Sequence, residues 1–287
     1  MDNLDVSIII LNQNSKDALK GCLNSVYKKI TGLKFEIVVV DNASKDDSLE
    51  MLRNDFPYVQ TIKLEKATKP TEAYNTAISQ SQAKYVFLLN SDTILINNSI
   101  KTLFDFMEEP LNSATGACGG ILFNQDDGMI KSFTFFPKIK NMLINHTFLK
   151  YIFPNVRKRY KNYETTFPDK PSRVDCISIA DLMLRKSVLD EVGLFDEDFV
   201  LSHSEIELQF RIKKAGYDVY FIPQSKIYYL EQRAIKKPLL LKATYLYFRK
   251  IRGILGEIVV RILFLPLHIK FVIANNFKAK NKKQFVI

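Results

Sequence analysis

The stretch KYVFLLNSDTIL, from Lys84 to Leu95, decides the fold, because its apolar run ends abruptly on Asn90, Ser91 and Asp92. A continuous apolar run of this kind is typical of a strand covered on both faces, as in a parallel sheet. Two earlier stretches repeat the pattern: VSIIILNQN reaches its polar cluster at residues 12–14, and FEIVVVDNASKDDS reaches one at Asp41, Asn42 and Ser44. Ligands of open α/β sheets bind beyond the carboxyl ends of the strands. The three clusters are therefore predicted to form one site.

Residues 6–95 are predicted to run strand, helix, strand, helix, strand, with the two helices over residues 15–30 and 46–56. This βαβαβ order is typical of the nucleotide-binding half of an α/β protein. Neither GxGxxG nor GxxxxGK[ST] occurs in the chain, which argues against a dinucleotide dehydrogenase and a P-loop enzyme. Recognition of a nucleotide is thus left to side chains at the strand ends.

The later part of the chain is less regular. Residues 133–172 show no clear period and are predicted to form a long loop or short helices over the active face, where long connections are often functional. Residues 204–217 are predicted to form a helix that ends at Gly216, since glycine is a good C-cap. Residues 218–223, DVYFIP, are predicted to form a closing strand.

Composition narrows the class of protein. The 287 residues are 47% hydrophobic, as in a globular protein with a sizeable core. Three cysteines without metal-site spacing argue against a disulfide framework and favour a cytoplasmic location, and the N-terminus shows no signal-peptide pattern. The net charge of +10 points to an anionic partner. No nucleic-acid-binding motif accompanies this charge, so nucleic acid is not expected as a partner.

Five stretches, in this order, resemble the inverting family 2 glycosyltransferases, especially their rhamnosyltransferase-like branch: SIIILNQN, VVVDNASKDDS, YVFLLNSDT, LMLRKSVLDEVGLFDEDF and ELQFRIKKAGYDVYFIP. The resemblance implies a GT-A fold over residues 1–235, built around one mixed, mainly parallel sheet. Residues 1–95 would be its Rossmann-like nucleotide-sugar-binding half and residues 96–235 its acceptor and catalytic half. The implied reaction is a metal-dependent transfer, with Mg²⁺ or Mn²⁺, of a sugar from a nucleotide diphosphate to an acceptor hydroxyl with inversion. The expected acceptor is a saccharide or a lipid-linked molecule in surface polysaccharide synthesis.

The resemblance also implies site residues. Asp41 matches the acid that contacts the nucleotide base, and Asp92 matches the last acid of the DxD-type motif that holds the metal and the diphosphate. Asn12, from the first polar cluster, and Asn75, retained from the family's glycine-rich segment, join them as expected nucleotide-binding residues. Glu205 falls at the position of the catalytic base. The alternative interpretations are an Asx turn at Asp41, a strand-end turn at Asp92 and the start of a surface helix at Glu205.

The chain departs from the family pattern in four places. Lys69 and Pro70 interrupt the glycine-rich segment, which predicts a different backbone path there. Asp181 follows a changed pair and is expected to crowd or recharge the acceptor pocket. The catalytic helix begins Ser-Glu-Ile-Glu from residue 204, and Tyr229 replaces an expected histidine. These departures favour the alternative that the protein is a non-catalytic relative that binds a nucleotide-sugar or a partner transferase.

Three residues near the catalytic helix carry smaller expectations. His203 is a weaker candidate for phosphate or metal binding. Arg211 is expected to pair with Glu207 four residues earlier in a mainly structural role.

Residues 236–287 mix apolar runs with regularly spaced basic residues. They lack the long uncharged span of a transmembrane helix, so they are predicted to form a basic amphipathic helical region that contacts the inner face of the membrane. The alternative is that this helix packs on the catalytic domain or on a second subunit, which would make the protein a homo-oligomer.

Overall fold

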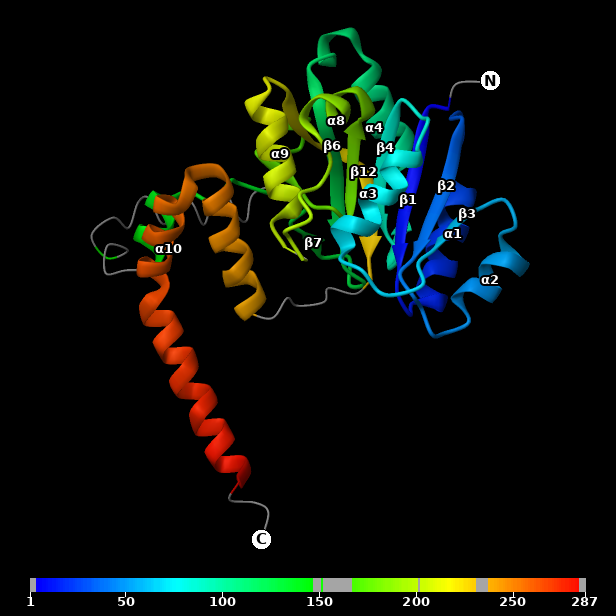
Figure 1. Cartoon of the computed structure of the whole chain (residues 1–287). Coiled ribbons are helices and arrows are strands. Elements are labelled where there is room, and N and C mark those ends of the chain that lie inside the picture. The colour runs from blue at the N-terminus through cyan, green and yellow to red at the C-terminus, as the bar shows by residue number, and fades with distance from the viewer. Residues whose placement is uncertain (1–3, 147–150, 152–166, 201, 231–236, 284–287) are drawn as a thin grey trace. The chain divides into compact units, whose positions relative to one another are not determined.

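The computed structural model describes residues 4–146, 151, 167–200, 202–230 and 237–283 (Figure 1). The chain divides into two compact units, one of Met1–Phe136 with Glu164–Leu239, the other of Pro137–Tyr163 with Leu240–Ile287. The predicted boundary at residue 235 lies in a stretch outside the described residues, and the split at residues 137–163 was not foreseen. That boundary stays a prediction.

The first unit is built on one mixed sheet. Its first half is parallel and has the order β3-β2-β1-β4, with β1 (Val6–Asn12), β2 (Phe35–Asp41), β3 (Gln60–Lys63) and β4 (Tyr85–Asn90). The sheet continues from β4 through β11 (Asp181–Arg185), β6 (Thr115–Phe123), β12 (Asp218–Tyr229) and β5 (Thr93–Leu95). β11 is antiparallel to both β4 and β6, whereas β6 and β12 are parallel. The predicted α/β fold with a mixed sheet is confirmed.

Alternation along the buried strands separates two hydrophobic cores. In β1, Ile8 and Ile10 belong to one core and Ile9 to the other, because successive side chains point to opposite faces of a strand. The first core is covered by α1 (Lys16–Lys29), α2 (Ser48–Asp55) and α4 (Ser99–Glu108), and the second by α3 (Pro70–Gln80), α8 (Lys186–Val192) and α9 (Ser204–Lys214) (Figure 1). Both faces of the sheet are therefore buried, which is why its strands read as continuous apolar runs.

Lys69 and Pro70 lie at the start of α3. Lys69 is the extended N-cap of the helix, and Pro70 occupies the first turn, where the missing N–H costs nothing. The different backbone path expected for this segment stays a prediction. Neither α3 nor the short edge strand β3 was predicted from the sequence.

The later part of the first unit carries several short elements around this sheet. β7 (Met129–Ile130) pairs with β6 and β9 (Ser172–Arg173) with β12, while β8 (Phe133–Thr134) and β10 (Cys176–Ile177) form a separate two-stranded sheet. A short 3-10 helix, η1 (Pro110–Asn112), follows α4. The predicted C-cap of α9 is confirmed, since Gly216 adopts a φ of 98° that glycine tolerates without strain. Most of the predicted loop over residues 133–172 lies outside the described residues.

The second unit contains α5 (Ile139–His146) and, from Leu240 on, α10 (Lys237–Lys283). Gly253 breaks α10 into two helices, because its φ of 71° and ψ of −172° are not helical. The predicted C-terminal helical extension is confirmed. Within the described part of the chain, no helix is long and apolar enough to cross a membrane.

Candidate active site

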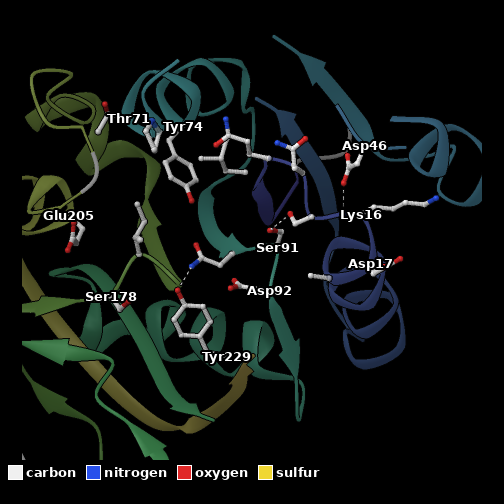
Figure 2. Close-up of a pocket in the computed structure, with 18 of the residues that line it drawn as sticks. Lys16, Asp17, Asp46, Thr71, Tyr74, Ser91, Asp92, Ser178, Glu205 and Tyr229 are labelled. Atoms are coloured by element: carbon white, nitrogen blue, oxygen red, sulfur yellow. Dashed lines mark hydrogen bonds between the residues drawn. The ribbon is translucent and has the colours of Figure 1, made fainter. Parts of the chain in front are cut away.

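A cavity of about 740 Å³ lies at the carboxyl ends of the parallel strands, within the range usual for small-molecule sites. Residues that follow all three strands line it: Gln13 after β1, Asp46 after β2 and Ser91 after β4. The first and third predicted clusters reach the lining, whereas Asp41, Asn42 and Ser44 of the second do not. Figure 2 shows Lys16 and Asp46 at one end, Glu205 at the other, and Asp92, Tyr74 and Tyr229 between them. The later part of the first unit contributes Ser178, Ile179, Ser204, Glu205 and Tyr229.

Backbone and side-chain hydrogen bonds fix the turn that contains Asp92. Its carbonyl accepts a 2.9 Å hydrogen bond from the Leu230 amide, and the next residue, Thr93, pairs with Tyr229 across β5 and β12. Asn90 donates a 3.2 Å hydrogen bond to the Tyr229 hydroxyl, which ties the end of β4 to the end of β12. Asp92 and Tyr229, where the resemblance expects a metal-binding acid and a histidine, therefore line the same part of the pocket (Figure 2).

Glu205 lies in the first turn of α9 and lines the far end of the pocket. Its side chain keeps some surface toward the cavity. The surrounding protein nevertheless excludes water from the carboxyl group, and this desolvation raises the pKa of Glu205. Hydrogen bonds from its own backbone N–H and from the Ser204 hydroxyl act in the opposite direction but are weaker. A positive helix end would lower a carboxyl pKa, so burial outweighs the dipole here. A carboxylate with a raised pKa is a stronger general base.

Gln209 holds the start of α9 against β10. Its amide accepts a 2.8 Å hydrogen bond from the Ile177 N–H and donates one of 2.8 Å to the Ile177 carbonyl. It also donates a 3.0 Å hydrogen bond to the carbonyl of Glu205. Gln209 thereby fixes the first turn of α9 relative to Ser178 and Ile179, the pocket residues that follow β10. This residue was not identified from the sequence, because its partner Ile177 lies more than thirty positions away.

The expected pair of Glu207 and Arg211 forms, and it is stronger than a surface pair. Two hydrogen bonds of 2.8 Å join the guanidinium of Arg211 to the Glu207 carboxylate, which is only 6% exposed. Arg211 also donates to the carbonyls of Val192, Gly193 and Leu194 at the end of α8. The pair clamps α9 to α8, and Glu207 does not line the pocket.

Asp41 and Asn12 are fully buried behind the pocket and do not line it. Asn12 Nδ2 donates 2.8 Å to Asp41 Oδ1, and the Ser44 N–H donates 3.0 Å to Asp41 Oδ2. Asn12 Oδ1 accepts a 2.7 Å hydrogen bond from Ser15, which does line the pocket. These two residues shape the loops under the site, and a direct nucleotide contact of either stays a prediction.

Asn75 also lies outside the pocket lining and instead fixes the segment that leads to α9. Its side-chain amide donates a 2.9 Å hydrogen bond to the Phe195 carbonyl and accepts one of 3.0 Å from the Phe195 N–H. It donates a further 2.9 Å hydrogen bond to Glu197. Near the start of α3, Thr71 donates 2.9 Å to the Phe199 carbonyl. A nucleotide contact of Asn75 stays a prediction.

Two other candidates are buried. Asp181 does not line the pocket, contrary to the expectation that it crowds or recharges it: the side chain is buried in the sheet and accepts a 2.7 Å hydrogen bond from the Gly120 N–H. Burial raises the pKa of Asp181 well above its ordinary value. His203 is the left-handed N-cap of α9, and burial lowers its pKa to about 4, so it is neutral at physiological pH.

The charges that line the pocket are unbalanced. They comprise five carboxylates and one lysine: Asp17, Asp46, Asp47, Asp92, Glu205 and Lys16. Lys16 Nζ is 3.2 Å from an Asp47 oxygen, so this cation is already paired. No group of three or more His, Cys, Asp and Glu side chains occurs among the described residues in an arrangement that would hold a metal unaided. Asp92 nevertheless fits an ion that binds with its substrate, since Mg²⁺ is commonly held by one or two carboxylates plus phosphate oxygens.

The fold is shared with a solved structure, that of GalNAc-T7 with UDP, GalNAc and Mn²⁺. The match has a TM-score of 0.62 at 16% identity and covers 85% of this chain and 47% of that one.

Curated relatives are similar over parts of the chain. An uncharacterised protein of Sinorhizobium fredii, y4gI, is 23% identical over 79% of this chain and 24% of its own length. WfgD of Escherichia coli, a UDP-Glc:α-D-GlcNAc-diphosphoundecaprenol β-1,3-glucosyltransferase, is 28% identical over 37% of this chain and 42% of its own. The chain thus spans less than half the length of these relatives. The model of the Glycosyl transferase family 2 matches residues 7–193, well over half of the chain, and the protein belongs to that family.

Proposed function

We propose that this pocket transfers a sugar from a nucleotide-diphosphate sugar to an acceptor hydroxyl with inversion at the anomeric carbon. The observation that carries the proposal is that Asp92, at a parallel strand end, and Glu205, a carboxylate of raised pKa, line one cavity. The first suits the diphosphate end of a donor and the second suits proton removal from an acceptor. Membership of the Glycosyl transferase family 2 supports this assignment.

In this mechanism Glu205 accepts the proton of the acceptor hydroxyl while the oxygen attacks the anomeric carbon. The new carbon–oxygen bond forms as the bond to the diphosphate breaks, and the nucleoside diphosphate leaves with the bonding electrons. Gln209 and the Glu207–Arg211 pair anchor α9. This anchoring supports the role of Glu205, because it fixes the position of the first turn of the helix. The desolvation of Glu205 brings the carboxylate closer in basicity to the hydroxyl that it must deprotonate in the transition state.

A divalent cation, Mg²⁺ or Mn²⁺, is part of the proposal because the described lining of the pocket is mainly acidic. The one lysine among these described residues is paired with Asp47, and their other charged groups are carboxylates. Asp92 would hold the ion together with the phosphate oxygens. The ion would supply positive charge to the leaving diphosphate.

The acceptor is proposed to be lipid-linked, as in the reaction for which WfgD is named. The α10 helix beyond Gly253 supports this, because it exposes a row of apolar side chains at helical spacing: Ile254, Leu255, Ile258, Val259, Ile262 and Leu265, between 42% and 77% exposed. The exposed Lys250 and Arg252 precede this row. An apolar face next to cations fits an anionic membrane surface, on which such a helix lies in the headgroup plane.

The membrane contact can be tested with liposomes. We expect the double variant Ile258→Glu with Ile262→Glu to lose sedimentation with vesicles that contain phosphatidylglycerol. Leu111→Glu is the matched control, since Leu111 is 96% exposed in the first unit. Undiminished sedimentation of the double variant would remove this face as the membrane contact.

The reaction itself is tested with a panel of nucleotide-diphosphate sugars. Incubated with Mn²⁺ and without acceptor, the protein is expected to release nucleoside diphosphate slowly from one or a few of them. Binding of a donor without release, and without transfer to any lipid-linked saccharide, would favour the non-catalytic relative. That alternative rests on the changed start of the catalytic helix, Ser-Glu-Ile-Glu from residue 204, and on Tyr229.

A further inference from the structure

Tyr74 occupies the centre of the pocket although the sequence analysis gave it no role. It comes from the second turn of α3, and its ring packs on Phe195 with the ring centroids 5.9 Å apart. The residue is only 4% exposed, yet it lines the cavity. In Figure 2 its hydroxyl points away from α3 into the pocket, toward the side on which Tyr229 and Asp92 lie. The phenol is thus held by packing of its ring, with its polar end toward the ligand space.

Among the described residues, none forms a hydrogen bond with the Tyr74 hydroxyl. Buried tyrosines usually find a partner for this group, and a group left without one is costly unless a ligand or water supplies it. Burial, and to a lesser extent the charges of Tyr229, Asp92 and Glu205 in that order, raise the pKa of Tyr74. The phenol therefore stays protonated and can act as a hydrogen-bond donor.

The surroundings indicate what this donor would meet. In Figure 2 the Tyr74 hydroxyl points toward the side of the pocket on which Tyr229 and Asp92 lie, which is the proposed diphosphate end. Among the described residues, those that line the pocket include a single lysine and five carboxylates, so an anionic ligand is served by neutral donors as well as by an ion. We propose that the Tyr74 hydroxyl donates a hydrogen bond to an oxygen of the donor's diphosphate, on the side that faces Asp92. This inference rests on the proposed function, since it requires a nucleotide-diphosphate ligand.

The test is the variant Tyr74→Phe, which keeps the ring on Phe195 and removes only the hydroxyl. With Mn²⁺ present, we expect the affinity for the nucleoside diphosphate that wild type binds, chosen from UDP, GDP and dTDP, to fall about tenfold or more. The affinity for the corresponding nucleoside, measured by equilibrium dialysis, should not change. Tyr217→Phe is the matched control, because the Tyr217 hydroxyl bonds Glu191 at 2.7 Å and does not line the pocket.

The possible outcomes separate this inference from the proposed function. If wild type binds no nucleoside diphosphate, both are overturned. If wild type binds and Tyr74→Phe binds equally well, only the role of Tyr74 is overturned. The same holds if Tyr74→Phe weakens nucleoside and nucleoside diphosphate by the same factor, because that pattern would mean a structural effect of the hydroxyl on the whole pocket.

Discussion

The two ends of the pocket carry their carboxylates in different ways. Asp92 lies two residues beyond β4, in a turn held by backbone pairing with β12. Glu205 lies at the start of a helix whose position depends on side chains from distant segments, above all Gln209 and the Glu207–Arg211 pair. A strand-end residue is placed by the sheet, whereas a residue on a docked helix is placed by tertiary contacts. The position of Asp92 therefore depends on backbone pairing, and the position of Glu205 depends on a side-chain network that single substitutions can loosen.

The largest expected effect tests the acceptor end. Glu205→Gln keeps the size and hydrogen bonding of the side chain but removes the base, so transfer should fall by at least about 10²-fold. The affinity for the nucleotide sugar, measured by titration calorimetry, should be nearly unchanged, because the group acts only in the transition state. Glu205→Asp should keep measurable activity.

The pH dependence sharpens this prediction. Activity requires the ionised carboxylate, and burial raises the pKa of Glu205, so wild-type transfer should increase with pH through an acid limb above the usual pKa of a glutamate. Glu205→Asp should keep an acid limb, and the residual activity of Glu205→Gln should lack it. Glu50→Gln makes the same chemical change at an exposed position outside the pocket and should behave as wild type. Wild-type transfer by Glu205→Gln would mean that another carboxylate is the base or that this helix has no catalytic role.

The second prediction tests the diphosphate end by comparing Asp92 with Asp41. Asp92→Asn should weaken nucleoside diphosphate binding about tenfold in the presence of Mn²⁺ and have little effect without it, because it removes the anionic metal ligand. Asp41→Ala should weaken binding equally with and without Mn²⁺. It should also lower the free energy of unfolding by roughly 1–3 kcal/mol, since it leaves the buried Asn12 amide and Ser44 N–H without their acceptor.

Calorimetry with and without Mn²⁺, together with urea unfolding, measures both variants. The same metal dependence for Asp92→Asn and Asp41→Ala would contradict the different roles that their positions suggest.

The difference between the two ends also explains what could be predicted from the sequence. The apolar runs and their polar ends identified β1, β2, β4 and the strand-end clusters, because this information is local. The sequence did not reveal that Asp41 accepts a hydrogen bond from Asn12. It also did not reveal that Asn75 and Gln209 hold the segments around Glu205 in place, since these roles depend on residues far along the chain. Asp181 was expected in the acceptor pocket for the same reason: its number along the chain does not tell which face of β11 it occupies.

The third prediction concerns Asn75 and the segment before α9. Asn75→Ala removes both hydrogen bonds to the Phe195 backbone, so this segment and the helix after it should lose their fixed position. We expect kcat to fall severalfold with little change in nucleotide affinity, because small misplacements of a catalytic group reduce rate more than binding. Ser79→Ala is the control, since Ser79 bonds only a carbonyl within α3. A change in nucleotide affinity with unchanged kcat would instead support direct nucleotide binding by Asn75.

The smallest expected effect concerns Asp181, a carboxyl on β11 that belongs to neither end of the pocket. Its Oδ2 accepts from Gly120, while Oδ1 is buried without a hydrogen-bond partner among the described residues. Burial raises the pKa of Asp181 in the folded protein, so the folded state keeps this proton at pH values where the unfolded chain has released it. The folded state then binds more protons, and the free energy of unfolding falls as pH rises from the unfolded pKa toward the folded one, by about 1.4 kcal/mol per pH unit at most.

Asp181→Asn should abolish this fall in the free energy of unfolding with rising pH, because the amide resembles the neutral acid and does not ionise. The variant and the wild type should be about equally stable near pH 4, and the variant should be more stable at pH 7.5, by on the order of 1 kcal/mol or more. Urea unfolding at the two pH values measures the difference. Asp190→Asn is the control at an exposed carboxyl, paired only with Lys186, and should change stability by no more than a few tenths of a kcal/mol at either pH. If the free energy of unfolding depends on pH equally in Asp181→Asn and wild type, Asp181 is ionised in the folded protein at neutral pH. The buried sheet between the two ends of the pocket would then accommodate a negative charge.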